Sequence, residues 1–239
     1  MTEQTLSKSI KQGIITSIPL ILGFFPVAMA FGLLSKNIGI SMRDTSFFSI
    51  FVFAGASQFM ALDLLKAGIS TGNIIIATFL LNLRHLMMSA SLSVRLKEIK
   101  KQWLFFIAFG ITDESFSVTS LTKTKLNTPF LLVFYGLTYL SWVSGTAAGY
   151  LVGTLLPSTL QSSLGIGLYG MFIALLVPEA KKSMPILFLA VSSGFLYIII
   201  SYFNIVSTSW RLIATIILAS GAGVLFLKDE TKEEEEEMI

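Results

Sequence analysis

Three polar motifs interrupt apolar stretches of the sequence, and their residue types could together bind a small charged molecule. A guanidinium group binds carboxylates, and adjacent carboxylates bind an ammonium group or a proton. Small residues next to an amide are compatible with an unwound membrane helix whose freed backbone groups face a substrate. The motifs are Gly55-Ala56-Ser57-Gln58-Phe59, Asn82-Leu83-Arg84-His85 and Thr112-Asp113-Glu114-Ser115.

Each motif lies near the middle of an apolar segment that is long enough to cross a bilayer. The segments are residues 47–65, 74–94 and 103–121, and about 20 apolar residues span the hydrocarbon core as a helix. An Arg at the centre of such a helix costs about 2.5–3.5 kcal/mol to insert. Two adjacent carboxylates at that depth could not both stay ionised without a cation. We therefore predict that Arg84 approaches Asp113 or Glu114, which leaves the other carboxylate available to bind a proton.

Composition indicates a membrane protein without a cofactor. Of the 239 residues, 54% are hydrophobic and only 13% are charged, whereas soluble domains carry about 25% charged residues. We expect an all-α, polytopic transmembrane helix bundle of about seven or eight membrane segments, with one or two broken or re-entrant helices. The absence of Cys and the single His argue against a disulfide framework and a metal site. The net charge of +3 is assigned to loops beside lipid headgroups, and not to nucleic-acid binding.

The chain is expected to hold one transmembrane transport domain at residues 13–227. Residues 1–12 would form a cytoplasmic or interfacial N-terminus, and residues 228–239 an acidic disordered tail. Loop charges do not decide the orientation. With a cytoplasmic N-terminus and eight full crossings the basic loop at residues 95–101 lies outside, whereas a re-entrant segment at residues 55–63 would make that loop cytoplasmic with seven crossings.

Proline and glycine positions predict how two of the spans pack. The first apolar run contains Pro19 and Pro26, so we expect it to be kinked or broken, because a proline frees a backbone carbonyl. The kink could serve packing alone or contribute to a site. Farther along, glycines at four-residue intervals predict a close helix crossing; they are Gly145, Gly149 and Gly153.

The polar motifs also have structural explanations. Gly55 to Ser57 could simply let helices pack closely while Gln58 bonds to a neighbour. Arg84 could form an ion pair that locks two helices together. A membrane-embedded enzyme with His85 and Asp113 as a hydrolytic pair would also need an aligned nucleophile, and we do not expect one.

The three motifs, in this order, resemble the AzlC family, the larger subunit of bacterial branched-chain amino acid permeases, also called the azaleucine-resistance family. The resemblance covers the layout of nearly the whole chain, although the second half matches mainly through its Gly-rich span and Phe172-Ile173-Ala174-Leu175-Leu176. It implies a multi-pass protein of the bacterial plasma membrane that exports Leu, Ile and Val, with Met as a further candidate. It also implies a separate small membrane subunit of the AzlD type as a partner.

We assign the site residues on the basis of what such a substrate needs. A zwitterionic aliphatic amino acid needs a cationic or helix N-terminal partner for its carboxylate, an anionic or carbonyl partner for its ammonium group, and an apolar pocket. The main alternative is a passive channel, or a permease for another small polar solute, but channels usually line a continuous pore with like charges or carbonyls. Proton coupling is assigned to Asp113 and Glu114, and substrate binding to Pro26, Gly55, Ser57, Gln58, Asn82, Arg84 and His85.

Overall fold

The structure is a computed structural model that describes residues 3–122, 126–157, 183–206 and 208–227, together with scattered positions from 159 to 181. Within this part of the chain all regular structure is helical. The predicted acidic tail, residues 228–239, lies outside the described residues. The chain divides into two compact units: a first unit of Met1–Lys66 with Asn82–Met171, and a second unit of Ala67–Leu81 with Phe172–Ile239. The assignment of residues 13–227 to a single transport domain stays a prediction.

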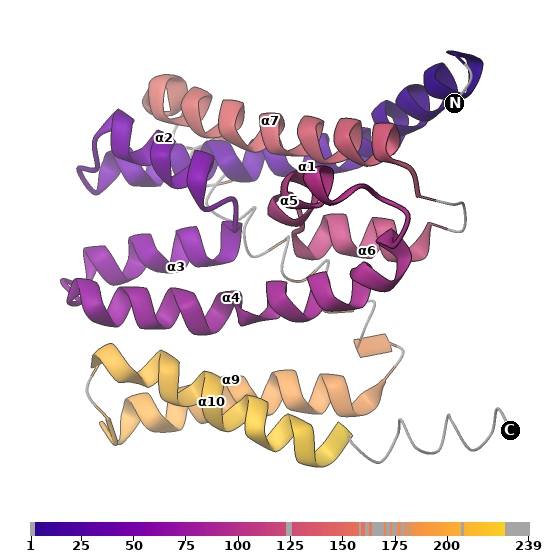
Figure 1. The fold of residues 1–239 in the computed structure, drawn as a ribbon. Coiled ribbons are helices and arrows are strands. Elements are labelled where there is room, and N and C mark those ends of the chain that lie inside the picture. The colour runs from indigo at the N-terminus through magenta and orange to yellow at the C-terminus, as the bar shows by residue number, and fades with distance from the viewer. Residues whose placement is uncertain are drawn as a thin grey trace, which may run out of the picture. The chain divides into compact units, whose positions relative to one another are not determined.

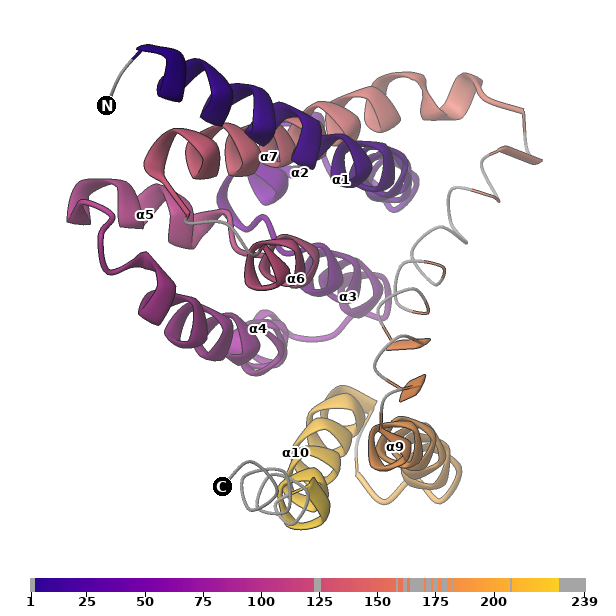
Figure 2. The same cartoon turned by 90° about the vertical axis from the view of Figure 1, so that its right-hand side faces the viewer.

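Helices α1 (Glu3–Asn37) and α7 (Thr128–Val152) run side by side in the first unit (Figure 1 and Figure 2). Glycines bring their backbones together: a Cβ on Gly145 would lie 2.7 Å from the Phe25 carbonyl oxygen, and one on Gly149 would overlap the Met29 carbonyl. The close crossing predicted from the glycine spacing is therefore confirmed.

Helix α1 continues through Pro19 and Pro26. The span is therefore not broken, and the kink that was the other expectation stays a prediction. A membrane helix tolerates internal proline where a neighbouring helix satisfies the freed backbone groups. The carbonyl that Pro26 leaves without its helical donor is that of Leu22, four residues earlier; Ser141 of α7 donates a hydrogen bond to the adjacent Ile21 carbonyl (3.2 Å).

The segment at residues 47–65 is interrupted, as predicted. Helix α2 (Met42–Phe51) ends before the Gly55 motif, and α3 (Gly55–Lys66) begins with it. Between them Phe53 has a φ of +38°, in the left-handed region that residues other than glycine seldom adopt. The Tyr139 hydroxyl of α7 donates to the Ile50 carbonyl (2.9 Å), which satisfies an acceptor near the end of α2.

The segment at residues 103–121 is also interrupted, which the sequence analysis did not predict. It forms α5 (Lys101–Phe109) and α6 (Asp113–Leu121). Thr112 caps α6 through a capping box with Ser115: each side chain accepts a hydrogen bond from the other residue's backbone N–H. This cap places Asp113 and Glu114 in the first helical turn, where the helix dipole favours negative charge.

The remaining helices complete the two units. Helix α4 (Thr71–Ser93) and the short 3₁₀ helix η1 (Val94–Leu96) precede α5, and the 3₁₀ helix η2 (Gly153–Leu155) follows α7. In the second unit α9 (Met184–Tyr202) packs against α10 (Thr208–Leu227), and Arg211 donates to the Asn204 side-chain oxygen in the turn between them.

Four helices within the described residues are long and apolar enough to cross a membrane. The two interrupted segments are shorter as individual helices, so a count of uninterrupted helices does not include them. The predicted all-α membrane bundle is confirmed in class, and the total of seven or eight segments stays a prediction. The four spans are Leu6–Asn37, Thr71–Leu96, Thr128–Leu155 and Met184–Tyr202.

Replacing Gly149 by Ala should destabilise the pair of α1 and α7. The added methyl group meets the backbone of Met29, which cannot rotate away, and overpacking costs about 1–3 kcal/mol. Gly23→Ala on α1 is the matched control, because nothing lies within 4 Å of a Cβ there. Thermal unfolding in detergent should show a lower Tm for Gly149→Ala only. Equal Tm values for the two variants would contradict the close crossing.

Candidate substrate-binding site

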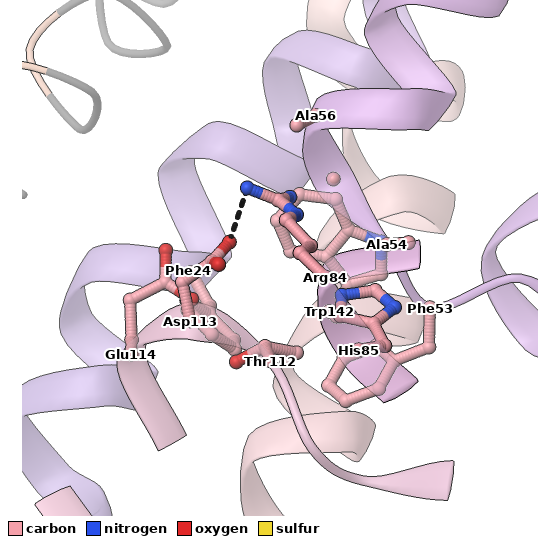
Figure 3. Close-up of a pocket in the computed structure, with 11 residues that line it drawn as sticks. Phe24, Phe53, Ala54, Ala56, Arg84, His85, Thr112, Asp113, Glu114 and Trp142 are labelled. Carbon is pink, nitrogen blue, oxygen red and sulfur yellow. Dashed lines mark ion pairs between the residues drawn. The ribbon is translucent and has the colours of Figure 1, made fainter. Parts of the chain in front are cut away.

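Arg84 of α4 and Asp113 of α6 form an ion pair in the first unit. Arg84 Nη1 lies 2.9 Å from Asp113 Oδ2, and the two side chains are 32% and 27% exposed (Figure 3). The prediction that Arg84 approaches one of the adjacent carboxylates is therefore confirmed. Within the described residues Glu114 makes no ion pair, so the cluster holds one cationic and two acidic groups.

A small pocket lies beside this ion pair and contains about 20 Å³, space for roughly one water molecule. It is lined by residues of both helix interruptions and of α1, α4 and α7. The two acidic residues lie on one side of the Arg84 guanidinium, while His85 and Phe53 lie on the other (Figure 3). The lining residues are Phe24, Phe53, Ala54, Gly55, Ala56, Arg84, His85, Thr112, Asp113, Glu114 and Trp142.

Helices α3 and α6 both begin at this pocket. Gly55 and Ala56 are the first residues of α3, and Asp113 and Glu114 are the first residues of α6. The first N–H groups of a helix have no partner within it and carry partial positive charge. The pocket therefore combines donors from α3 and Arg84 with the carboxylate acceptors of α6. Such a set can bind both charged ends of a zwitterion.

Ser57 and Asn82 connect α3 to α4 near the pocket. The Asn82 side-chain nitrogen donates to Ser57 Oγ (3.1 Å), and Ser57 Oγ donates to the Ala54 carbonyl (2.9 Å). Two polar atoms nearby, Asn82 Oδ1 and Arg84 Nε, are buried and have no hydrogen-bond partner among the described residues. Because a buried polar atom without a partner is costly, this acceptor and this donor indicate where ligand groups could bind.

Gln58 is fully buried but does not line the pocket. Its side-chain oxygen accepts a hydrogen bond from Trp142 Nε1 (3.0 Å), and its side-chain nitrogen donates to Ser49 Oγ (3.2 Å). Ser49 in turn shares a hydrogen bond with Thr146 (2.7 Å). Gln58 therefore holds Trp142, which does line the pocket, and its direct contact with substrate stays a prediction.

Pro26 is a predicted site residue that neither lines the pocket nor bonds to a residue described above. It lies on an exposed part of α1 and does not line the pocket. Gly55, Arg84, His85, Asp113 and Glu114 all line it. Gly55 also leaves room for an aromatic wall, because a Cβ there would lie 2.7 Å from the Trp142 ring.

Arg95 has a role that the sequence analysis, which treated it as a loop charge, missed. Its guanidinium donates to the carbonyls of Thr119 (2.6 Å), Ser120 (2.7 Å) and Thr122. A cation at this end of α6 satisfies the final carbonyls and complements the helix dipole. Arg84 and Arg95 thus hold the two ends of α6. This contact could not be predicted from the sequence, because hydropathy shows residues 103–121 as one apolar segment and does not reveal α6 as a separate short helix.

One sequence string has the spacing of a hydrolase nucleophile, Gly68-Ile69-Ser70-Thr71-Gly72. The hydrolase motif places its serine between a strand and a helix. Here the string links helices α3 and α4, so its surroundings do not match the catalytic motif.

Comparison with known proteins identifies similar membrane proteins. Residues 19–156 match the family described as "AzlC protein", a range that contains all three polar motifs. An uncharacterized membrane protein of Archaeoglobus fulgidus is 34% identical over 181 residues, which cover 74% of this chain and 80% of the relative. The inner membrane protein YgaZ of Escherichia coli is 28% identical over 188 residues, 75% of this chain and 77% of YgaZ.

A further relative carries a transport name. The "branched-chain amino acid transport protein AzlC" of Bacillus subtilis is 27% identical over 169 residues, which cover 70% of this chain and 66% of that protein. No solved structure matches this chain.

Proposed function

Because this chain belongs to the AzlC family of membrane transport proteins, we propose that it moves the branched-chain amino acids Leu, Ile and Val across the membrane. The observation that carries the proposal is the Arg84–Asp113 pair, with Glu114 beside it, where α3 and α6 begin. Opposite charges and helix N-termini at one pocket suit a zwitterion. The name of the Bacillus subtilis relative supports an aliphatic side chain.

The charged groups suggest how the substrate binds. Its carboxylate would accept hydrogen bonds from Arg84 and from the first N–H groups of α3. Its ammonium group would donate to Asp113 and Glu114. Because a carboxylate bound to Arg84 takes the place of Asp113, binding would release Asp113 to pair with the ammonium group. Substrate binding thereby rearranges the ion pair that joins α4 to α6.

The size of the pocket favours a transporter with alternating access over an open channel. A volume of about 20 Å³ is too small for an amino acid, so the lining elements must move apart to admit one. Helices α3 and α6 each begin at an interruption next to the pocket. Broken helices of this kind surround the binding sites of many secondary transporters.

We further propose that the chain is a proton-coupled exporter that works with a small AzlD-type membrane subunit. Arg84 balances the charge of Asp113, whereas Glu114 makes no ion pair within the described residues. Glu114 is therefore our candidate for the carboxylate that binds and releases a proton during the cycle. The partner subunit is inferred from the family resemblance.

An efflux assay tests this function. Cells preloaded with radiolabelled leucine should release it faster when this chain and an AzlD-type subunit are produced together than when either is produced alone. Release should saturate with leucine concentration and depend on the proton gradient. Flux that rises linearly with concentration and ignores the gradient would favour a passive channel. Release equal to that of cells without the chain would refute the transport proposal.

A further inference from the structure

An apolar groove of about 590 Å³ lies in the first unit among α2, α5 and α7. Aromatic rings form most of its wall, including those of Trp103, Phe109 and Tyr139, and Gly136 leaves space on its α7 side. The groove differs from the polar pocket in both size and chemistry. It is large enough for the hydrocarbon side chain of any amino acid, and its wall would take such a side chain out of water favourably.

The ring of Phe53 lies between the polar pocket and two of the rings that line this groove. Phe53 lines the polar pocket and is only 2% exposed. Its ring stacks on Phe109 at a centroid distance of 6.3 Å and meets Tyr139 edge to face at 5.2 Å. Phe109 and Tyr139 line the groove, and Phe53 does not, so these three rings in contact lie between the two cavities.

The backbone at Phe53 is strained. Its φ of +38° falls within the three-residue link between α2 and α3. A bulky residue in this conformation persists only where its surroundings hold it, and such residues are concentrated at ligand clamps and switches. The Tyr139 hydroxyl holds the neighbouring end of α2 through the Ile50 carbonyl. A movement of α2 relative to α3 would therefore also move the ring of Phe53.

We propose that Phe53 is a gate between the two cavities, and that the groove receives the hydrocarbon side chain of an amino acid whose charged groups bind in the polar pocket. This inference rests on the proposed function. The polar pocket has room for about one water molecule, so an aliphatic side chain needs another volume. The groove is the apolar volume beyond Phe53, and Phe53, with Phe109 and Tyr139 behind it, must move aside before a side chain can enter.

Filling the groove should change the preference for side-chain size. Gly136→Leu places a side chain in the groove, because no described residue beyond the helix's own backbone lies within 4 Å of a Cβ there. The readout is the concentration of unlabelled alanine or leucine that halves counterflow of radiolabelled valine in vesicles containing the full chain and its partner subunit. In the variant, the half-inhibiting concentration of leucine should rise by about tenfold or more relative to that of alanine, because an apolar pocket discriminates side-chain size by this amount. Gly23→Leu, also at a site with nothing within 4 Å of a Cβ, should keep the wild-type ratio.

Removing the gate gives a second measurement. Phe53→Gly deletes the ring, and glycine adopts positive φ without strain. In this variant, the concentration of phenylalanine that halves valine counterflow should fall by about tenfold relative to that of leucine. The result with Gly136→Leu does not depend on whether Phe53→Gly folds.

The outcomes separate this inference from the proposed function. If the wild-type protein gives no counterflow of valine, the transport function fails and the gate fails with it. If the wild-type protein transports valine but Gly136→Leu keeps the wild-type ratio of leucine to alanine, the groove faces lipid and the gate is refuted. An equal shift in Gly23→Leu would also refute it, because the effect would not depend on the groove.

Discussion

Replacing Arg84 by Gln is expected to abolish leucine counterflow. The substitution removes the cation proposed to bind the substrate carboxylate, and it also leaves Asp113 without its partner at 2.9 Å. Loss of one member of a hydrogen-bonded charge pair costs about 2–5 kcal/mol, which corresponds to roughly 30-fold or more in affinity. Arg43→Gln is a matched control, because Arg43 pairs with Asp44 at an exposed position. It should transport leucine at the wild-type rate.

A double variant distinguishes substrate binding from structural pairing. Arg84→Gln alone leaves a partly buried carboxylate without a cation, so the amount of folded protein in the membrane should fall. Adding Asp113→Asn removes that charge and should restore the amount of protein without restoring counterflow. Recovery of both would show that Arg84 and Asp113 only hold α4 and α6 together.

The approach of Arg84 to an acidic residue could be predicted from the sequence, because an unpaired charge inside a membrane costs a large free energy. An Arg and two carboxylates at mid-membrane depth each need a partner, and the chain offers few choices. Which carboxylate pairs with Arg84 could not be predicted, because that depends on where α6 begins. The Thr112–Ser115 capping box marks the start of α6. It is hard to recognise in the sequence, because Ser115 stands where a capping box usually has Glu or Gln.

The features that could not be predicted from the sequence depend on contacts between distant segments. The first span was expected to be kinked or broken at its prolines, and it is continuous; the effect of proline in a membrane helix depends on its neighbours, and α1 packs along α7. The hydrogen bond from Trp142 to the Gln58 amide joins residues 84 positions apart, and the assignment of Gln58 to the substrate stays a prediction. The three carbonyls bound by Arg95 are likewise at the end of a helix that hydropathy alone does not delimit.

Replacing Glu114 by Gln is expected to separate amino acid exchange from energy coupling. Gln resembles the protonated carboxyl group in size and hydrogen bonding but cannot release a proton. Because Arg84 pairs with Asp113 and not with Glu114, the Arg84 side of the site should be preserved. Counterflow should therefore continue, while efflux driven by the proton gradient should fall at least about fivefold, the lower end of typical coupling between two ligands.

Asp113→Asn is the informative comparison, because it alters the adjacent carboxylate of the same helical turn. This change removes the partner of Arg84, so we expect weaker leucine binding and slower counterflow as well as slower net efflux. Measuring both fluxes in both variants separates the two roles, since only Glu114→Gln should retain exchange. If both variants keep full gradient-driven efflux, neither carboxylate carries the proton, and Asp113 and Glu114 must be assigned to helix packing around Arg84.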